Sequence, residues 1–297
     1  MTKVLVLGAS GMLGHKLIQR FAPRFETHGS VHTSVSPWLS RLFTSESVSL
    51  HYADALDLGG IANTIAVVDP DVVVNAIGVV KQSENANDTE RSMAINAHFP
   101  SRLADVCAEA DCRLILISTD CVFSGDRGFY SETDAPDPVD TYGRTKLLGE
   151  VEGEQILTIR TSMIGRELLS SRGLIEWFLS NRGSEVRGFS RAIFSGLTTI
   201  ALADLLADVI EKHPSLRGLY HVAGEPIDKY RLLMLVRDAY DADIKINEDS
   251  DVRIDRSLDG SRFRTMTGYV AEPWPVLIRG MAADQTPYDD LRRSCSA

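Results

Sequence analysis

The sequence predicts an α/β fold: a doubly wound parallel sheet of the Rossmann type, with a smaller C-terminal substrate lobe interleaved with it. Two observations lead to this prediction. Short apolar runs rich in β-branched residues alternate with segments of helical periodicity as far as residue 163, and a glycine-rich turn follows the first run. Nearly continuous apolar strands are typical of a parallel sheet that helices cover on both faces.

The alternation assigns each element in turn. Strands are expected at 3–8, 26–32, 71–78, 113–119 and 155–162, and helices at 14–21, 56–68 and 93–110. Beyond residue 163 the pattern changes to helices at 173–180, 198–213 and 228–240, with one more buried strand at 218–224.

This change of pattern suggests a division of the chain. Residues 1–163, joined by parts of 193–224, are expected to form a dinucleotide-binding domain. Residues 164–192 and 225–284 are expected to form the substrate lobe. Residues 285–297 lack periodicity, so we expect them to be a flexible tail.

Composition excludes several classes of protein. The 297 residues carry a formal net charge of −10, which argues against a protein that binds the backbone of nucleic acids. The four cysteines form no C-x-x-C pair, so no metal site or disulfide framework is expected, and reduced thiols indicate a cytoplasmic protein. The apolar run at the N-terminus is too short for a signal peptide or a membrane span.

The turn "GASGMLG" lies between the first strand and the first helix, where a dinucleotide is bound in Rossmann-like folds. Gly8 permits a tight turn, Gly11 lets the backbone approach a pyrophosphate, and Gly14 lets helix and strand pack closely. The phosphates would lie over the helix N-terminus, where free N–H groups favour negative charge. The expected contacts include three further residues of this turn: Ser10, Met12 and Leu13.

The kind of dinucleotide is less well determined. A cofactor with a free ribose 2′-hydroxyl usually meets an Asp or Glu at the end of the second strand, but that strand ends with His32 and hydroxyl residues. NADP(H) is therefore favoured modestly over NAD(H). Asp54 and the adjacent Ala55 would lie near the adenine, although an Asp at this position is also typical of a helix cap.

Hydroxyl groups and a Tyr–Lys pair complete a candidate reaction centre. Ser118 and Thr119 end a strand expected near the middle of the sheet, and ligands of such sheets bind beyond the carboxyl ends of the strands. Tyr142 and Lys146 follow at an i,i+4 spacing that places both on one face of a helix.

In these motifs the chain resembles the extended short-chain dehydrogenase/reductase superfamily, and within it the dTDP-4-dehydrorhamnose reductase group. The resemblance runs nearly end to end. It rests on "GASGMLG", "DVVVNAIG", "INAHFP", "STDCVFSG", "DPVDTYGRTKLLGE" and "IRTSMIG", and then on "RAIFSGLTT", "GLYHVAG" and "RIDRSLDGSRF".

The resemblance implies catalytic roles for Thr119, Tyr142 and Lys146. Thr119, with Ser118 as a second candidate, would hydrogen-bond a substrate carbonyl, Tyr142 would donate a proton to its oxygen, and Lys146 would hold the nicotinamide ribose. The residue types suit this chemistry, because hydride addition to a ketone creates an alkoxide that needs a proton donor within reach. A lysine cation nearby would lower the phenol pKa.

Further cofactor contacts are expected from three segments. The turn Asn75, Ala76, Ile77 and Gly78 would lie against the ribose and phosphates, and Arg160, Thr161 and Ser162 near the nicotinamide. Asn96 matches a superfamily asparagine that orders a water near the lysine. A hydrogen bond from Asn96 to the backbone at a helix kink is an equally good interpretation.

The expected substrate contacts are Lys81, Asp120, Cys121, Val122, Phe123, Arg187, Arg191 and Arg256. Arginine suits a diphosphate because its planar fork binds two oxygens at once, although surface charge is an equally good interpretation for each cation. Cys121 departs from the family, since dehydratases of the superfamily have glutamate at this position and the rhamnose-pathway reductases usually have tyrosine.

These features favour an NAD(P)H-dependent reductase of a keto group, with C4 as the expected position, on a nucleotide-activated deoxysugar. A nucleotide-sugar C4 epimerase and a non-catalytic nucleotide-sensing subunit on the same fold are the alternatives. A nucleotide-sugar substrate is the expected partner, a homodimer is compatible with the sequence, and no nucleic acid or membrane is expected.

Overall fold

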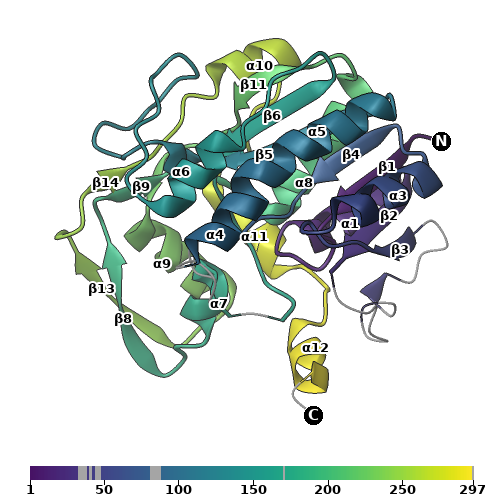
Figure 1. Ribbon diagram of the computed structural model, residues 1–297. Helices are drawn as coiled ribbons and strands as arrows, with labels where there is room; N and C mark the ends of the chain where they lie inside the picture. The colour runs from purple at the N-terminus through teal and green to yellow at the C-terminus, as the bar shows by residue number, and fades with distance from the viewer. Residues whose placement is uncertain (33–38, 40–41, 44–47, 81–87, 170, 296–297) are drawn as a thin grey trace.

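The protein is described here by a computed structural model that covers residues 1–32, 39, 42–43, 48–80, 88–169 and 171–295. Its main feature is a seven-stranded sheet in the order β11-β6-β5-β4-β1-β2-β3 (Figure 1). All neighbouring pairs in this sheet are parallel. The strands are β1 Lys3–Leu7, β2 Glu26–Val31, β3 Val48–Tyr52, β4 Val72–Asn75, β5 Arg113–Thr119, β6 Ile156–Thr161 and β11 Gly218–His221.

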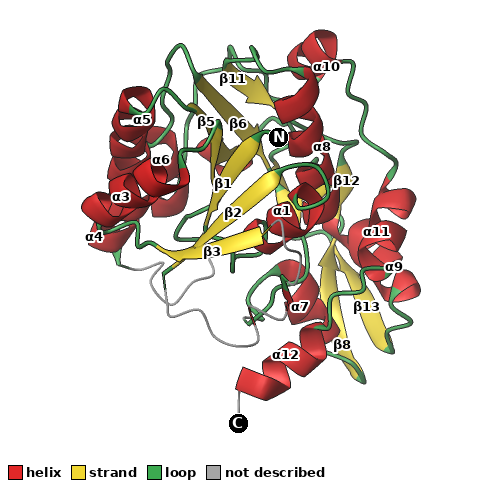
Figure 2. Cartoon of the chain, turned by 90° about the vertical axis from the view of Figure 1, so that its right-hand side faces the viewer, coloured by secondary structure: helices red, strands yellow, loops and turns green. Residues whose placement is uncertain are grey.

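Helices cover both faces of this sheet, as the apolar strands predict (Figure 2). On one face lie α3 Leu58–Val68, α4 Thr89–Ser92, the π-helix η2 Met93–His98, α5 Phe99–Glu109 and α6 Thr141–Leu148. On the other lie α1 Gly14–Phe21 and α8 Thr199–Lys212. The strand order reverses between β1 and β4, and ligands of doubly wound folds bind beyond the carboxyl ends of the strands at this point.

The apolar core follows these two layers. One cluster joins α1 and α8 to the sheet through residues such as Leu17, Phe21 and Leu206, and it continues into the C-terminal part of the chain. A second joins α3 and α5 to the opposite face through Ile65 and Leu103. Burial of these side chains fixes which face each helix covers.

The C-terminal half supplies smaller sheets outside the main one. They are β10-β7, β12-β9-β14 and β13-β8, built from β7 Met163–Ile164, β8 Ser184–Phe189, β9 Ala192–Phe194, β10 Leu197–Thr198, β12 Ile227–Asp228, β13 Ile244–Asp249 and β14 Ile254–Asp255. The helices here are α7 Leu174–Leu179, α9 Lys229–Ala239, α10 Ser261–Thr267 and α11 Trp274–Ala282. Strand β11 and helix α8 belong with the main sheet, whereas β9 pairs with strands of the smaller part.

The segment expected to be a tail, residues 285–297, contains a helix that the sequence pattern did not predict. Residues Tyr288–Cys295 form helix α12, which extends away from the body of the molecule towards the C-terminus (Figure 1). Tyr288 and Leu291 are buried, and Tyr288 bonds to Asp284 and His15. Because only a few residues anchor this segment, it shows no long apolar periodicity in the sequence.

Candidate active site

The glycine turn has the geometry that a dinucleotide needs. Gly8 has φ +90°, a conformation that side chains disfavour. A Cβ at Gly14 would lie 1.9 Å from the Gly8 carbonyl oxygen, so helix α1 approaches strand β1 too closely for any residue but glycine. These two features hold the helix N-terminus open for phosphate.

A cavity of about 250 Å³ adjoins this turn. Nine residues expected to bind cofactor line it: Gly8, Ser10, Gly11, His32, Asp54, Ala55, Ala76, Ile77 and Gly78. They come from the ends of four neighbouring strands, so the structure brings together segments that are remote in the sequence. Two further residues of the turn differ in exposure, since Met12 is partly exposed and the Leu13 side chain is packed in the core.

Some residues of this cavity were not identified from the sequence. Ser30 ends β2, and its hydroxyl accepts a hydrogen bond from the Gly8 N–H at 3.2 Å. Arg91 of α4 adds a cation to the lining, beside Val79 and Ile95. An arginine three residues after a capping Asp88 has no motif of its own, so only the fold brings it to the cofactor side.

Two polar residues at the cavity also support its walls. Asp54 lines the cavity and accepts a hydrogen bond from the Leu56 N–H at 2.9 Å, so it holds its own turn as well. The side chain of Asn75 is buried and accepts from the Ile77 N–H at 3.0 Å. Its side chain therefore fixes the turn that follows β4.

Asn96 is held by the backbone. It lies in η2, is buried, and exchanges two hydrogen bonds of 2.9 Å with the N–H and carbonyl of Val79. Its amide also donates to the Thr145 hydroxyl at 3.2 Å. These contacts agree with the backbone-bonded interpretation, and they tie the cavity wall to helix α6.

Helix α6 carries the Tyr–Lys pair and is fixed at both ends. Asp140 caps its N-terminus by accepting from the Gly143 N–H at 2.8 Å. A Cβ at Gly143 would lie 2.1 Å from the Cys121 carbonyl oxygen, and one at Gly149 would lie 1.9 Å from that of Asn96. The helix is thus pressed against the turn η3 (Asp120–Val122) on one side and against η2 on the other.

This packing brings Tyr142 to Thr119. Burial raises the pKa of the Tyr142 phenol above its ordinary value, the neighbouring Cys121 acts in the same direction, and a hydrogen bond with Thr119 opposes them. The shift is thus opposite to the lowering expected beside Lys146, and the phenol stays protonated at neutral pH. The Thr119 hydroxyl donates to Asp120 at 3.2 Å and accepts from the Cys121 N–H at 3.1 Å.

Lys146 lies partly buried, and its ammonium donates to the Ile117 carbonyl at 2.7 Å. Burial lowers the pKa of Lys146 to about 8, and the Glu150 carboxylate partly opposes this effect. The ammonium has three protons, so two remain to serve other acceptors. The cation is therefore present at neutral pH and is lost at moderately alkaline pH.

Ser118 and Arg160 form a buried network with Glu150 beside this lysine. The Ser118 hydroxyl donates to Glu150 at 2.6 Å, and the Arg160 guanidinium forms an ion pair with the same carboxylate at 2.7 Å. Because side chains alternate along a strand, Ser118 points to the opposite face from Thr119. The expected contacts of Ser118 with the carbonyl and of Arg160 with nicotinamide stay predictions, and in this structure both side chains bind Glu150. The neighbouring Thr161 is also buried.

The expected substrate residues divide into those near the Tyr–Lys pair and those elsewhere. Arg256, from the segment after β14, donates to the Phe123 carbonyl at 2.9 Å and to the Cys121 sulfur at 3.7 Å. Asp120 is buried, interacts with Arg256 and Ser162, and its pKa is raised chiefly by burial. Burial likewise raises the pKa of the Cys121 thiol to about 12, which makes it a poor nucleophile.

Four other expected substrate residues do not point towards the Tyr142–Lys146 pair, and a fifth lies outside the described residues. Val122 and Phe123 are fully buried, and the Phe123 ring stacks on Tyr130 at 4.2 Å, so their side chains belong to the core. Arg187 is exposed and paired with Asp249 and Asp251, and Arg191 is exposed in the turn between β8 and β9. Lys81 lies outside the described residues.

Comparison with known proteins identifies the family. The model of the RmlD substrate binding domain matches residues 1–248. The chain belongs to this family. The match includes the glycine turn and extends through the Tyr–Lys helix into the C-terminal part, so it covers all residues that line the cavity.

Individual relatives differ in what their names state. The dTDP-4-dehydrorhamnose reductase of Mycolicibacterium smegmatis is 34% identical over 150 residues, which are 50% of this chain and 40% of that enzyme. Methionine adenosyltransferase 2 subunit beta of Mus musculus is 24% identical over 306 residues, covering 93% of this chain and 88% of the subunit. A hypothetical dTDP-4-dehydrorhamnose reductase from Sulfolobus tokodaii superposes with a TM-score of 0.76 at 27% identity, covering 92% and 98% of the two chains.

Two other features concern what the described residues lack. Among them, no group of three or more His, Cys, Asp or Glu side chains is arranged to hold a metal ion. None of the helices in the described ranges is long and apolar enough to cross a membrane.

Proposed function

We propose that this protein reduces a keto group, at C4, of a nucleotide-activated deoxysugar with NADPH. The observation that carries the proposal is the meeting of Tyr142 with Thr119 on a helix that also holds Lys146 and contacts the wall of the glycine-turn cavity. A proton donor, a carbonyl-binding hydroxyl and a cation beside a dinucleotide cavity are what ketone reduction requires.

Each of the three side chains has a distinct task. Tyr142 stays protonated because burial raises its pKa, so it would donate its proton to the sugar oxygen as negative charge develops there. Thr119 would hydrogen-bond the same oxygen and orient the carbonyl towards Tyr142. Lys146 would hold ribose hydroxyls with the protons not used by Ile117, and its charge would stabilise the phenolate left after proton transfer.

The cofactor cavity fits a nicotinamide dinucleotide, because the glycines leave room where a Cβ would clash. The bound cofactor supplies the hydride. Gly8, Gly11 and the N–H groups of α1 would hold the pyrophosphate. His32 and Arg91 line the cavity, and the Arg91 guanidinium would favour a 2′-phosphate and hence NADPH over NADH.

The substrate side would be shaped by Asp120, Cys121 and Arg256, which contact one another next to Thr119. The family to which the chain belongs and the reductases among its relatives support a nucleotide sugar as the substrate. Cys121 is smaller than the tyrosine usual in the group. We therefore expect this pocket to accept a sugar other than, or in addition to, dTDP-4-dehydrorhamnose.

A panel of nucleotide 4-ketosugars, assayed separately with NADPH and NADH, tests the proposal. Wild-type protein should consume NADPH stoichiometrically with at least one sugar, and Tyr142→Phe should lose turnover while binding cofactor nearly as before. Retention of most activity by Tyr142→Phe would refute the mechanism. Interconversion of two sugars without net NADPH consumption would indicate an epimerase instead.

A non-catalytic nucleotide-binding subunit is a second candidate, favoured by one observation. The match to methionine adenosyltransferase 2 subunit beta covers nearly all of both chains, whereas the match to the mycobacterial reductase covers half of this one. A stable stoichiometric complex with a partner enzyme, without turnover of any ketosugar in the panel, would support this candidate. Turnover that depends on Tyr142 would exclude it as the sole function.

A further inference from the structure

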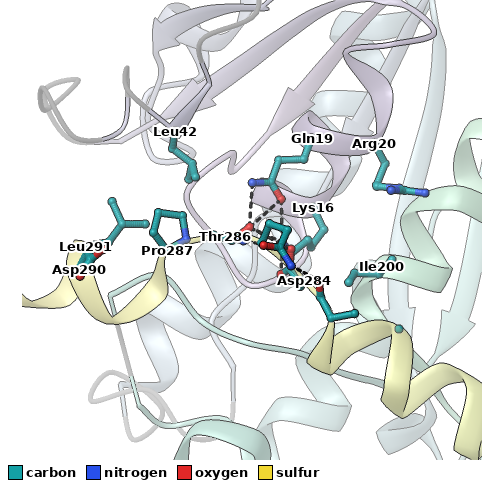
Figure 3. A pocket seen from close by; sticks show the side chains of 13 residues that line it. Lys16, Gln19, Arg20, Leu42, Ile200, Asp284, Thr286, Pro287, Asp290 and Leu291 are labelled. Carbon is teal, nitrogen blue, oxygen red and sulfur yellow. Dashed lines mark hydrogen bonds and ion pairs between the residues drawn. The ribbon is translucent and has the colours of Figure 1, made fainter. Parts of the chain in front are cut away.

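A cavity of about 690 Å³ lies between helix α1 and the segment that leads into α12 (Figure 3). Both cations of α1 that line it are paired. Lys16 forms an ion pair with Asp284 at 2.5 Å and donates to Thr286 at 2.8 Å, and Arg20 forms an ion pair with Asp204 at 2.5 Å. These contacts tie distant parts of the chain together, so the cations have a structural task. The chemistry that the proposed function leaves unassigned lies in the active site.

The Cys121 thiol has two partners that ketone reduction does not require. It hydrogen-bonds the Asp120 carboxylate, and its sulfur accepts a hydrogen bond from the Arg256 guanidinium at 3.7 Å. Asp120 is buried, whereas Cys121 is only partly buried and forms no disulfide. The thiol is therefore held between a proton acceptor and a cation.

Cys121 also lies beside the two hydroxyls that would hold the ketone oxygen. Its N–H donates to the Thr119 hydroxyl at 3.1 Å, and it is close enough to Tyr142 to raise the pKa of that phenol. A Cβ at Gly143 would lie 2.1 Å from the Cys121 carbonyl oxygen, so the start of α6 fixes this position. A ketone bound by Thr119 and Tyr142 would therefore bring an adjacent ring carbon towards the Cys121 sulfur.

A carbon next to a ketone carries an acidic hydrogen. Its removal leaves an enolate whose charge lies largely on the carbonyl oxygen, and donors aimed at that oxygen stabilise it. Thr119 and Tyr142 would serve an enolate as they serve the alkoxide that forms in reduction. Enolisation needs one further group, a base beside the carbon, and Cys121 has both the position and a proton acceptor of its own.

We propose that this protein also enolises its ketosugar, with Cys121 as the base that removes the proton from a carbon next to C4, either C3 or C5. The sulfur forms an S–H bond with that proton while the original thiol proton passes to Asp120. The electron pair of the broken C–H bond moves to the carbonyl oxygen, and Arg256 stabilises the negative charge that develops on sulfur. Reversal returns a proton to the same face of the carbon, whereas protonation by water from the other face inverts it.

The transfer to Asp120 is needed because the thiol is protonated at rest. Burial raises the pKa of Cys121 to about 12, so a free thiolate is scarce at neutral pH. Burial also raises the pKa of Asp120, which makes this carboxylate a stronger proton acceptor than an ordinary one. This inference rests on the proposed function, since it requires that the chain bind a nucleotide 4-ketosugar.

Exchange with heavy water, measured on the full-length protein, tests this proposal. The nucleotide 4-ketosugars of the panel, beginning with dTDP-4-dehydrorhamnose, are incubated in D₂O with NADP⁺ and without NADPH, so that no reduction occurs. Deuterium at C3 and C5 is followed by NMR. The wild-type protein should introduce deuterium at one of these carbons faster than buffer alone. Cys121→Ser and Asp120→Asn should each lower the protein-dependent rate at least about 100-fold, the lower end of the effect of a general base.

Comparison with reduction separates this role of Cys121 from a general effect on the site. Cys121→Ser should lose far more exchange than NADPH-dependent reduction. Tyr142→Phe should show the opposite pattern, losing reduction but keeping part of the exchange, because Thr119 still binds the carbonyl oxygen. Cys112→Ser is the matched control and should change neither rate, since Cys112 directly precedes β5 and lies at the opposite end of that strand from Thr119.

Two results would overturn the inference. One is a wild-type protein that reduces a ketosugar but exchanges it no faster than buffer, and the other is a folded Cys121→Ser protein that exchanges as fast as the wild type. A wild-type protein that exchanges a ketosugar but does not reduce it with NADPH would contradict the proposed function and leave this inference standing. Thermal unfolding of each variant shows whether a lost rate reflects unfolding.

Discussion

Glu150 follows the C-terminal end of α6, four residues after Lys146, and we predict that it maintains the charge of that lysine. Burial lowers the pKa of Lys146 to about 8, and Glu150 is the group that raises it. A group whose pKa is about 8 is charged below that pH and neutral above it. Reductase activity should therefore have an alkaline limb near pH 8 in the wild-type protein.

Replacing Glu150 by Gln should move this limb to lower pH. Two charges about 6 Å apart at an effective dielectric constant of about 20 interact by roughly 3 kcal/mol. Arg160, paired with the same carboxylate, stays in place in this variant, so the whole attraction is lost, which corresponds to a shift of about two pH units. At pH 8 the protonated fraction of Lys146 would fall about 50-fold, and at pH 6.5 about fourfold.

The pH dependence of kcat, measured between pH 6 and 9.5, tests this prediction. Ser118→Ala removes the 2.6 Å hydrogen bond to Glu150 but keeps its charge, so the limb should stay near pH 8. The double variant Glu150→Gln/Arg160→Gln removes both charges, and the limb should return towards pH 8. An unshifted limb in a folded Glu150→Gln protein would refute the reasoning.

Three further predictions concern the cofactor and the stability of the fold. Arg91→Ala should raise the KM for NADPH several-fold more than that for NADH; equal effects would show that Arg91 does not meet the 2′-phosphate. Gly149→Ala should lower the free energy of unfolding by about 3 kcal/mol, because the new Cβ would lie 1.9 Å from the Asn96 carbonyl oxygen. Gly280→Ala is the control, since a Cβ there would have no atom within 4 Å and should not destabilise the protein. Burial lowers the pKa of His15 to about 3 and of His221 to about 4, so the unfolded chain binds protons more readily and stability should fall as pH drops below 6.5, by about 2 kcal/mol per histidine at pH 5. Equal denaturation midpoints at pH 7 and pH 5 would contradict the last prediction.

The main sheet and the reaction centre follow from local patterns in the sequence. The apolar run 113–119 coincides with β5, because a buried central strand needs apolar residues on both faces. The strand, glycine turn and helix that begin the chain were likewise predicted, since Gly8 and Gly14 are required by the turn and by close packing. Tyr142 and Lys146 lie on α6 as their spacing indicates.

Other features depend on contacts that no local pattern reveals. Arg91 lines the cofactor cavity because α4 directly precedes η2 in the fold. Tyr288, near the C-terminus, contacts His15, near the N-terminus. Strand alternation could have predicted that the Ser118 side chain points away from Thr119, because neighbouring residues of β5 face opposite sides of the sheet. The burial of Phe123 depends on Tyr130 and Leu258, which pack on it from elsewhere.

Transfer of hydride to a sugar carbon is the central claim, and isotope transfer tests it most directly. NADPH with deuterium in the transferable position is incubated with a nucleotide 4-ketosugar that the wild-type protein consumes, and the product is analysed by mass spectrometry and NMR. The account predicts one deuterium at C4 of the product sugar, and no labelled product with Tyr142→Phe. Product without deuterium, or labelled product formed equally well by Tyr142→Phe, would contradict it.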